Sequence, residues 1–548
     1  EVGIGMLAFA SPLSFEAADT FYGWLYPATY ERFALLSAIR LAGVSLVLLP
    51  PAMLMGGTLP LFVAQYVRSG HRIARNVGLL YALNTVGAAV GCAVCGFLLL
   101  RDVGIDATIR LAAAANAAIG IAMLLLPLPG PRPAAEPAPG PERKDGAPSG
   151  LVLPVLFFAI GCIALSNEVL WTRYLSLLFH NTVYTYTVTL TVMLAGIVAG
   201  SLAGAFLFDA LRRRALVFGA VQVATGLVVL AVLLLPPSFW AGLDDPEALR
   251  TQLTAALLVL LLPAVLSGLS FPLAIRMAVR DASGAPRGVG RMSALNTAGG
   301  ITGSLLTGFA LLPALGLSRT LLVVTAASLA VGITAWLVLD RSLGRARALA
   351  LAAASAASWL ALPSLSGTRL PQDFLARGRP LLDFREGIGA HLAVVDEDGV
   401  RTLEIDRLWQ GEDRKTHQVV AAHVPMLLAA RPERVLVIGL GPGQTASRFL
   451  HYPIERLDCV EIERELVPLV RAHFDSAWMD DPRVRFVLED GRNFLTHTDL
   501  RYDVISIEIG QVFRPGLAAF YSGDFYRRAR ERLRPDGVLA QFLPIGYL

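Results

Sequence analysis

The sequence predicts a polytopic all-α membrane part with two parallel repeats, then a small β-hairpin region and a Rossmann-like α/β domain. Three observations predict it: a change of composition near residue 366, a sequence repeat at an offset of 212 residues, and an alternation of strands and helices after residue 416. Of the 548 residues, 55% are hydrophobic and 16% charged, with a mean hydropathy of +0.57. Soluble domains carry about 25% charged residues, so an ordinary soluble enzyme is excluded.

The first part of the chain consists of apolar blocks of about 18 to 25 residues, long enough to cross a hydrocarbon core. The run Val2 to Pro12 is too short to span, so we expect the chain to begin inside a membrane helix. Spans are expected at 34–62, 77–100, 105–127, 151–178, 183–208, 215–236, 251–278, 291–313 and 317–338, with an Ala-rich last candidate at 348–366.

These blocks predict the domain boundaries. We expect membrane repeat one at 1–127 (N-terminally truncated), a Pro-rich linker at 128–150, membrane repeat two at 151–338, and the last candidate span with a linker at 339–369. The N-terminal β part follows at 370–430 and the Rossmann-like domain at 431–548. The chain stops just after a predicted strand at 538–542, so we expect this domain to be C-terminally truncated.

The repeat needs no gap. Matching residues are Pro51 and Pro263, Gly56 and Gly268, Pro60 and Pro272, Ala-Leu-Asn-Thr at 82–85 and 294–297, Gly87 and Gly299, and Gly91 and Gly303. The offset spans an even number of helices, so we expect parallel repeats related by an axis along the membrane normal. Glycines four residues apart predict close helix packing, and Asn84 and Asn296 can hydrogen-bond between helices.

Glu168 and Arg173 are ionisable residues at membrane depth, where such groups are paired or functional. Their spacing of five does not place them on one helix face, so each is expected to have a partner on another helix. We favour ion-pair packing over a substrate or proton path. The cysteines Cys92, Cys95, Cys162 and Cys459 lie in apolar surroundings and predict no disulfide framework.

Basic residues predict the orientation. One set of alternate loops holds fifteen: Arg68, Arg72, Arg75, Arg132, Arg143, Lys144, Arg212, Arg213, Arg214, Arg280, Arg287, Arg291, Arg341, Arg345 and Arg347. The other set holds four: Arg32, Arg101, Arg250 and Arg319. The first set is therefore expected in the cytoplasm. If 348–366 spans, as we predict, the α/β domain lies outside the cytoplasm; if that segment lies on the interface, the domain is inside. The net charge of +4 indicates no nucleic-acid partner.

The last part of the chain begins with a predicted hairpin, His391 to Val395 and Val400 to Ile405. After a helix at 417–428, the apolar strand 435–438 opens on the turn Gly439-Leu440-Gly441-Pro442-Gly443. Glu461 ends the next strand, 22 residues after Gly439. Glycines admit close backbone approach and such an acid accepts hydrogen bonds from ribose hydroxyls, so the pattern predicts a nucleoside site. Glu489-Asp490 and Glu508 follow the strands at 484–488 and 502–507, on the same predicted edge.

A set of motifs carries a family resemblance. They are Gln410, His423-Val424-Pro425, the glycine-rich strand and turn at 435–443, Val-Glu-Ile-Glu at 460–463, Asp-Pro-Arg-Val at 481–484, Glu-Asp-Gly-Arg at 489–492, Tyr-Asp-Val-Ile at 502–505 and Tyr-Ser-Gly-Asp-Phe-Tyr at 521–526. In this order and spacing, residues 388–548 resemble a spermidine synthase. With the membrane part, the chain resembles bacterial proteins that fuse a multi-spanning domain to a spermidine-synthase-like domain, which implies the bacterial inner membrane.

The resemblance implies a domain of the S-adenosylmethionine-dependent methyltransferase type that transfers an aminopropyl group. Its co-substrate would be decarboxylated S-adenosylmethionine or S-adenosylmethionine, with no tightly bound cofactor and no metal. Cofactor-binding residues would be Gln410 lining the nucleoside pocket, the turn glycines Gly439, Gly441 and Gly443, Glu461 at the ribose and Asp490 at the adenine. Glu508 would be the catalytic base, in a position where the family has an aspartate.

Other positions depart from the family pattern. Pro442, Val419 and Gln511 replace acids, and His417 replaces a tyrosine. Since those acids would meet a polycationic amine, the resemblance implies an intact nucleoside end and an altered amine end. Three interpretations follow: a transferase with a non-standard acceptor, a non-catalytic subunit of a membrane complex, or a transporter with a nucleoside-sensing domain. We favour the first.

Overall fold

We describe the protein from a computed structural model of the chain. The structure describes residues 1–29, 32–66, 73–126, 151–179, 182–208, 211–236, 239–240, 249–279, 285–340, 343–361, 372–387, 389–413, 416–512, 514 and 516–543. The predicted linker at 128–150 lies outside these ranges. Residues 1–14, 46–175 and 184–370 belong to one compact unit, and residues 15–45, 176–183 and 371–548 to a second.

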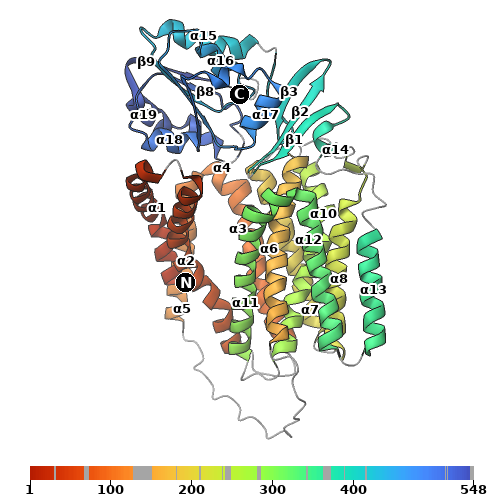
Figure 1. The fold of residues 1–548 in the computed structure, drawn as a ribbon. Coiled ribbons are helices and arrows are strands. Elements are labelled where there is room, and N and C mark those ends of the chain that lie inside the picture. The colour runs from red at the N-terminus through yellow and green to blue at the C-terminus, as the bar shows by residue number, and fades with distance from the viewer. Residues whose placement is uncertain are drawn as a thin grey trace. The chain divides into compact units, whose positions relative to one another are not determined.

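The first unit is helical (Figure 1). Its elements are α3 (Ile73–Val94), η2 (Cys95–Leu99), α4 (Leu100–Asp102), α5 (Gly104–Leu125), α6 (Val152–Leu178), α7 (Val183–Leu207), α8 (Arg214–Leu233), α10 (Leu249–Ala278), α11 (Ala285–Leu306), η3 (Thr307–Leu311), α12 (Leu312–Thr334), η4 (Ala335–Leu339) and α13 (Arg345–Ala361). Helices α1 (Val2–Thr29) and α2 (Phe33–Tyr66) contribute to both units.

Within the described residues, eight segments are long and apolar enough to cross a membrane. They cover the spans predicted between 34 and 338. The last two predicted spans fall in one segment, Pro286–Leu339, but Gly316 interrupts it with φ 75°. Helix α13 has 17 residues and is not among the eight. The length and apolar character of these helices indicate a multi-pass membrane protein.

Helix α1 differs from the short remnant predicted at Val2 to Pro12, because it runs for 28 residues. Its second half, which carries Glu16 and Asp19 among aromatic residues, is also helical. A hydropathy run marks how far a segment is apolar, and a helix can continue beyond it.

Close packing is found at Gly299 and Gly303, two of the glycines predicted to pack closely. A Cβ atom at Gly299 would lie 2.0 Å from the Phe158 carbonyl oxygen, and one at Gly303 would lie 2.1 Å from that of Cys162. Helix α11 therefore packs directly on the α6 backbone. Around Gly87 and Gly91, no described atom beyond the adjacent residues and the local helix backbone lies within 4 Å of such a Cβ. The prediction of close packing was wrong for these two, because an equivalent sequence does not guarantee an equivalent neighbour.

We expect Gly303→Val to destabilise the helical unit while Gly91→Val does not. The new side chain at 303 must displace the α6 backbone, and overpacking of this kind costs about 1–3 kcal/mol. Both changes carry the same intrinsic helix cost, so Gly91 is a matched control. Thermal unfolding of the purified full chain in detergent measures the difference. Equal transition temperatures for the two variants would contradict the packing.

The second unit contains two sheets. The antiparallel sheet has the order β1-β2-β3-β4, formed by β1 (Leu381–Glu386), β2 (His391–Glu397), β3 (Val400–Ile405) and β4 (Leu408–Glu412), and α14 (Gln372–Ala376) precedes it. The predicted hairpin is present as β2 and β3. The outer strands β1 and β4 were not predicted, because their mixed polar sequences become strands only through pairing with the hairpin.

The second sheet is parallel, in the order β7-β6-β5-β8-β9. Its strands are β5 (Arg434–Ile438), β6 (Arg456–Glu461), β7 (Val484–Leu488), β8 (Tyr502–Ile507) and β9 (Leu533–Gln541), with α15 (Thr416–Leu428), α16 (Gln444–Phe449), α17 (Leu466–His473), η6 (Ala477–Asp480), α18 (Gly491–His497), η7 (Leu517–Tyr521) and α19 (Gly523–Arg532) between or before them. The predicted α/β alternation is confirmed. The last strand begins earlier than the predicted 538–542.

Helices cover both faces of this parallel sheet (Figure 1). Val435 and Val437 of β5 belong to the core formed with α15, α16 and α17. Leu436 and Ile438 of the same strand belong to the core formed with α18 and α19. Alternate residues of a strand point to opposite faces, so a strand with both faces covered has a continuous apolar sequence.

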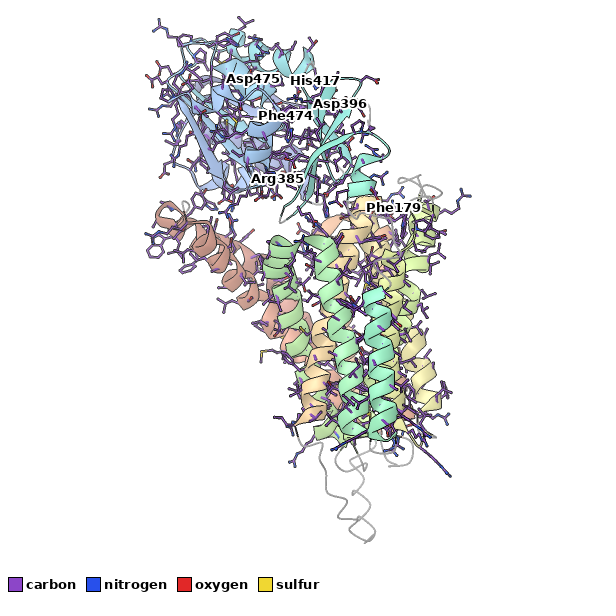
Figure 2. The ribbon with its side chains drawn as sticks, turned by 45° about the vertical axis from the view of Figure 1, so that its right-hand side comes forward. Phe179, Arg385, Asp396, His417, Phe474 and Asp475 are labelled. Atoms are coloured by element: carbon purple, nitrogen blue, oxygen red, sulfur yellow. The ribbon has the colours of Figure 1, made fainter. Side chains whose placement is uncertain are left out.

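The antiparallel sheet contacts both ends of α17. The Arg385 guanidinium of β1 donates to a Glu465 carboxylate oxygen at 3.4 Å, just before this helix begins. At the other end, the Arg401 guanidinium donates to the His473 carbonyl at 2.6 Å. In Figure 2, Arg385 lies at one end of this sheet, and Phe474 and Asp475 follow α17. These contacts attach the antiparallel sheet to the α/β core.

Candidate functional site

The carboxyl ends of the parallel strands form the edge that carries the candidate site. The strand order reverses at β5, with β6 on one side and β8 on the other. Ligands bind at such a reversal in open α/β sheets. Gly439, Gly441 and Gly443 follow β5 with φ values of 92°, 52° and 84°. A residue with a side chain is strained in this conformation, so the glycines permit the tight turn.

Glu461 at the end of β6 reaches over this turn. Its carboxylate accepts from the Leu440 N–H at 2.9 Å and from the Glu463 N–H at 2.8 Å. The side chain is 8% exposed, and burial raises the pKa of Glu461 although both N–H groups oppose that change. Glu461 therefore connects the ends of β5 and β6 and holds the glycine-rich turn in place.

Asp490 follows β7 and caps α18. Its carboxylate accepts from the Arg492 N–H at 2.9 Å and from the Arg492 guanidinium at 2.7 Å. Burial by itself raises the pKa of Asp490, but the hydrogen bonds and charge of Arg492 outweigh it and lower the pKa below the usual value. Asp490 is therefore an ionised acceptor on the same edge, with Arg492 bound to it.

Glu489, the residue before Asp490, is a second buried carboxylate on this edge. Its N–H donates to the Glu461 carbonyl at 3.0 Å, which places β7 beside β6. One carboxylate oxygen accepts from Arg40, in the part of α2 that belongs to this unit, at 2.5 Å. Among the described residues, no donor reaches its other oxygen. A buried oxygen of this kind is available to a ligand donor.

Glu508 lies at the end of β8, directly beside β5. Its N–H donates to the Ile438 carbonyl, and its carboxylate accepts from the Ser506 hydroxyl at 2.8 Å and the Thr445 hydroxyl at 2.9 Å. Burial raises the pKa of Glu508, and the two hydroxyl groups only partly offset it. A carboxyl group whose pKa is raised toward neutrality can act as a general base.

Gln410 reaches the same turn from β4. Its carbonyl oxygen lies 3.7 Å from the position of a Cβ atom on Gly441. The next residue, Gly411, leaves no room for a side chain, since a Cβ there would lie 2.6 Å from Pro442. Pro442 is buried in this contact. The proline that replaces a family acid therefore packs the turn against β4.

The other departures from the family pattern lie nearby. The Gln511 amide donates to the Trp409 carbonyl at 3.3 Å, and Arg514 donates to the Gln511 side-chain oxygen at 3.4 Å. The His417 ring lies 5.5 Å from the Trp409 ring and 5.7 Å from Phe542. Val419 follows on α15. The replaced positions themselves are therefore not acidic. Two carboxylates lie nearby and are already bound: Glu412 accepts from the Trp409 indole at 3.3 Å, and Asp406 pairs with Arg514.

The structure thus gathers Gln410, Gly439, Gly441, Glu461 and Glu508 around one turn, while Asp490 shares the edge and is bound to Arg492. The sequence pattern did not predict the residues that donate hydrogen bonds to these carboxylates. They are Ser506 and Thr445 at Glu508, and Arg492 at Asp490. The contact of Ser506 with Glu508 could have been predicted, because residues two apart in a strand lie on the same face. The contact of Thr445 could not, because this residue comes from another element.

Within the described residues, no group of three or more His, Cys, Asp or Glu side chains could hold a metal ion.

Comparison with known proteins identifies this part of the chain. The family model described as a spermine/spermidine synthase domain matches residues 415–542. The C-terminal part of the chain contains a spermidine synthase/aminopropyltransferase domain. A region of many long apolar helices precedes this aminopropyltransferase domain.

Relatives match the domain over part of their length. The polyamine aminopropyltransferase of Nitrosomonas europaea is 30% identical over 174 residues, which are 30% of this chain and 53% of that protein. Polyamine aminopropyltransferase 2 of Pseudomonas aeruginosa is 35% identical over 147 residues, 26% of this chain and 42% of that protein. The crystal structure of spermidine synthase from Thermotoga maritima matches with a TM-score of 0.28 and 22% identity, over 30% of this chain and 56% of that one. The chain spans about half the length of the curated relatives it matches.

Proposed function

We propose that the aminopropyltransferase domain binds an adenosyl compound at the edge described above and transfers a group from it to an acceptor other than a common polyamine. The observation that carries the proposal is the position of Glu461 and Glu508 beside a glycine-rich turn at the strand-order reversal, with Asp490 on the same sheet edge. The co-substrate is decarboxylated S-adenosylmethionine or S-adenosylmethionine, bound reversibly and without a metal.

Each residue has a role in this proposal. Glu461 accepts from the ribose hydroxyls, Asp490 from the adenine amino group, and Gln410 lines the pocket beside Gly441. Glu508 accepts the proton that the attacking nucleophile loses, and the nucleophile then displaces the thioether from the sulfonium carbon. The raised pKa of Glu508 supports this role.

The acceptor is not expected to be putrescine. Pro442 is buried against Gly411, and Gln511 lies between Trp409 and Arg514. These groups offer no carboxylate to a second ammonium, and an unpaired ammonium in a closed site is costly. Rapid production of spermidine from putrescine by the purified protein would contradict this part of the proposal.

Calorimetry tests nucleoside binding. The purified full chain in detergent is titrated with methylthioadenosine, the adenosyl product of aminopropyl transfer. We expect saturable binding, and we expect putrescine to leave it unchanged. No heat of binding at millimolar concentration would refute the proposed site.

A second candidate function is a non-catalytic subunit of a membrane complex or a nucleoside sensor of a transporter. One observation favours it: hydroxyl groups of Ser506 and Thr445 already bind both oxygens of Glu508. This candidate predicts nucleoside binding without turnover. Release of methylthioadenosine or S-adenosylhomocysteine in the presence of any acceptor distinguishes the two functions.

We also propose that the helical part consists of two parallel repeats. Apart from the sequence, a local irregularity supports this: π-helical segments occur at Cys95–Leu99 and Thr307–Leu311, separated by the same offset of 212 residues. Each follows a long helix that carries the Asn-Thr and glycine motif. A π-helical turn is rare, so its recurrence in register favours common descent of the two copies.

We propose that α13 spans the inner membrane of a bacterium and that the aminopropyltransferase domain lies outside the cytoplasm. The Trp359 indole N–H of α13 donates to the Thr325 hydroxyl of α12 at 2.9 Å, which supports a helix packed along the others. We expect Ala357→Arg to move the domain across the membrane, since a central charge costs about 2.5–3.5 kcal/mol on insertion. Ala357→Ser is the control. A reporter fused after Leu548 that is active only in the cytoplasm for the unmutated chain would contradict the proposal.

A further inference from the structure

The helical unit contains a cavity that no function considered so far explains. It has a volume of about 80 Å³ and lies between α6, α7, α8 and α10. All four helices are candidate membrane spans. The walls are mainly apolar, but a group of polar side chains also borders the cavity: Asn167, Glu168, Gln222, Thr225, Ser267 and Ser270.

Glu168 is the ionisable member of this group. No described residue forms an ion pair with Glu168 or donates a hydrogen bond to its carboxylate, so the ion pair favoured by the sequence is not formed there. The Thr172 hydroxyl donates to the Glu168 backbone carbonyl at 2.8 Å and does not reach the carboxylate. An ionised carboxylate at membrane depth is costly without a partner. A ligand bound in the cavity can supply a partner for the Glu168 carboxylate.

A second acceptor in the cavity wall is also open. The side-chain oxygen of Asn167, adjacent to Glu168 in α6, is buried and accepts no hydrogen bond within the described chain. The neighbouring amide of Gln222 is different, because it donates to the Ser270 hydroxyl at 2.7 Å. Unsatisfied buried acceptors are rare in folded proteins, so the open oxygen of Asn167 indicates that a donor binds there.

The cavity also has an aromatic side. Trp171 is 1% exposed and lines the cavity one turn after Asn167 and Glu168. An indole ring attracts cations through its π system, and the attraction grows when water is excluded. A carboxylate, an amide oxygen and an indole ring together form a site for a cation that has both N–H donors and carbon atoms.

We propose that this cavity binds a small organic cation through a primary ammonium group, held by the Glu168 carboxylate and the Asn167 side-chain oxygen. The three N–H donors of an ammonium suit these acceptors and the nearby hydroxyls, while its carbon chain suits the apolar walls. On this scale a cavity of about 10–15 Å³ holds one water, so about 80 Å³ accepts methylammonium or one end of a longer amine. The inference concerns the helical unit and does not depend on nucleoside binding.

Direct binding to the full chain in detergent tests the proposal. Radiolabelled methylammonium is the probe, measured by equilibrium dialysis, with putrescine and sodium ions as competitors. We expect saturable binding, displacement by putrescine, and little displacement by sodium. Glu168→Gln keeps the size of the side chain and should weaken binding at least tenfold. Asp106→Asn, the same change at an exposed position of α5, should leave binding unchanged.

Two further measurements make the test decisive. Glu168→Gln should keep a cooperative thermal unfolding transition in detergent, which shows that the variant is folded. Its methylthioadenosine binding should equal that of the unmutated chain, which separates this site from the proposed nucleoside site. If Glu168→Gln does not fold, Asn167→Ala should still weaken methylammonium binding severalfold. Absence of saturable binding, equal binding by the folded Glu168→Gln variant, or stronger displacement by sodium than by putrescine would overturn the proposal.

Discussion

Glu508→Gln is expected to slow group transfer by about 10² to 10⁴, the range for removal of a positioned general base. Glutamine keeps the size of the side chain and can still accept from one of the two hydroxyl groups, Ser506 or Thr445, so the fold should be retained. It has no basicity at the pH of the assay. Release of methylthioadenosine or S-adenosylhomocysteine measures the loss whichever acceptor proves best.

The pH dependence gives a second readout for Glu508. Burial raises the pKa of Glu508, and a base acts only when it is ionised. The rate should therefore rise with pH through a value above about 4.3, the ordinary pKa of glutamate. Thr445→Val removes a hydrogen bond that lowers the pKa, so it should shift this rise to still higher pH. Glu455→Gln, an exposed carboxylate in the same domain, is the control. An unchanged rate in Glu508→Gln would exclude Glu508 as the base.

Glu461→Ala is expected to destabilise the domain and weaken nucleoside binding together. The change leaves the Leu440 and Glu463 N–H groups without their acceptor. Each unsatisfied buried donor costs about 1–3 kcal/mol, so the loss of stability should reach about 2–6 kcal/mol. The ribose loses the same acceptor, which should weaken methylthioadenosine binding by a further 1–3 kcal/mol or about 5- to 150-fold.

Hydrogen exchange separates these effects in Glu461→Ala. The Leu440 and Glu463 amides should exchange faster than in the unmutated chain, because both lose their hydrogen bonds. Glu461→Gln keeps one acceptor oxygen, so its loss of unfolding free energy should be about half of the loss in Glu461→Ala. Glu531→Ala, at an exposed position of α19, should change neither stability nor binding. Normal methylthioadenosine affinity in a folded Glu461→Ala protein would contradict the proposed ribose contact.

Several parts of the site could be predicted because their signals are local in the sequence. The glycines at 439, 441 and 443 are required by positive φ angles in one turn, and Glu461 occurs at the regular distance after it. Strand ends place Asp490 and Glu508 on the same edge without any knowledge of packing. The role of Thr445 was not accessible in this way, because a hydrogen bond between elements depends on how those elements pack. Arg492 lies only two residues after Asp490, so its contact with that carboxylate is local.

The sequence by itself determined where the apolar stretches lie, the order of strands and helices in the parallel α/β domain, and the chemical types at the strand ends. These follow from hydropathy, side-chain periodicity and the special conformations of glycine, which act over a few residues. Only the tertiary structure decided that Gly303 packs on α6 while Gly91 does not, that Pro442 fills the turn against Gly411, and that Glu168 borders a cavity without an ion-pair partner among the described residues. Each of these depends on which distant backbone or side chain comes close, and that choice is made by packing the whole unit.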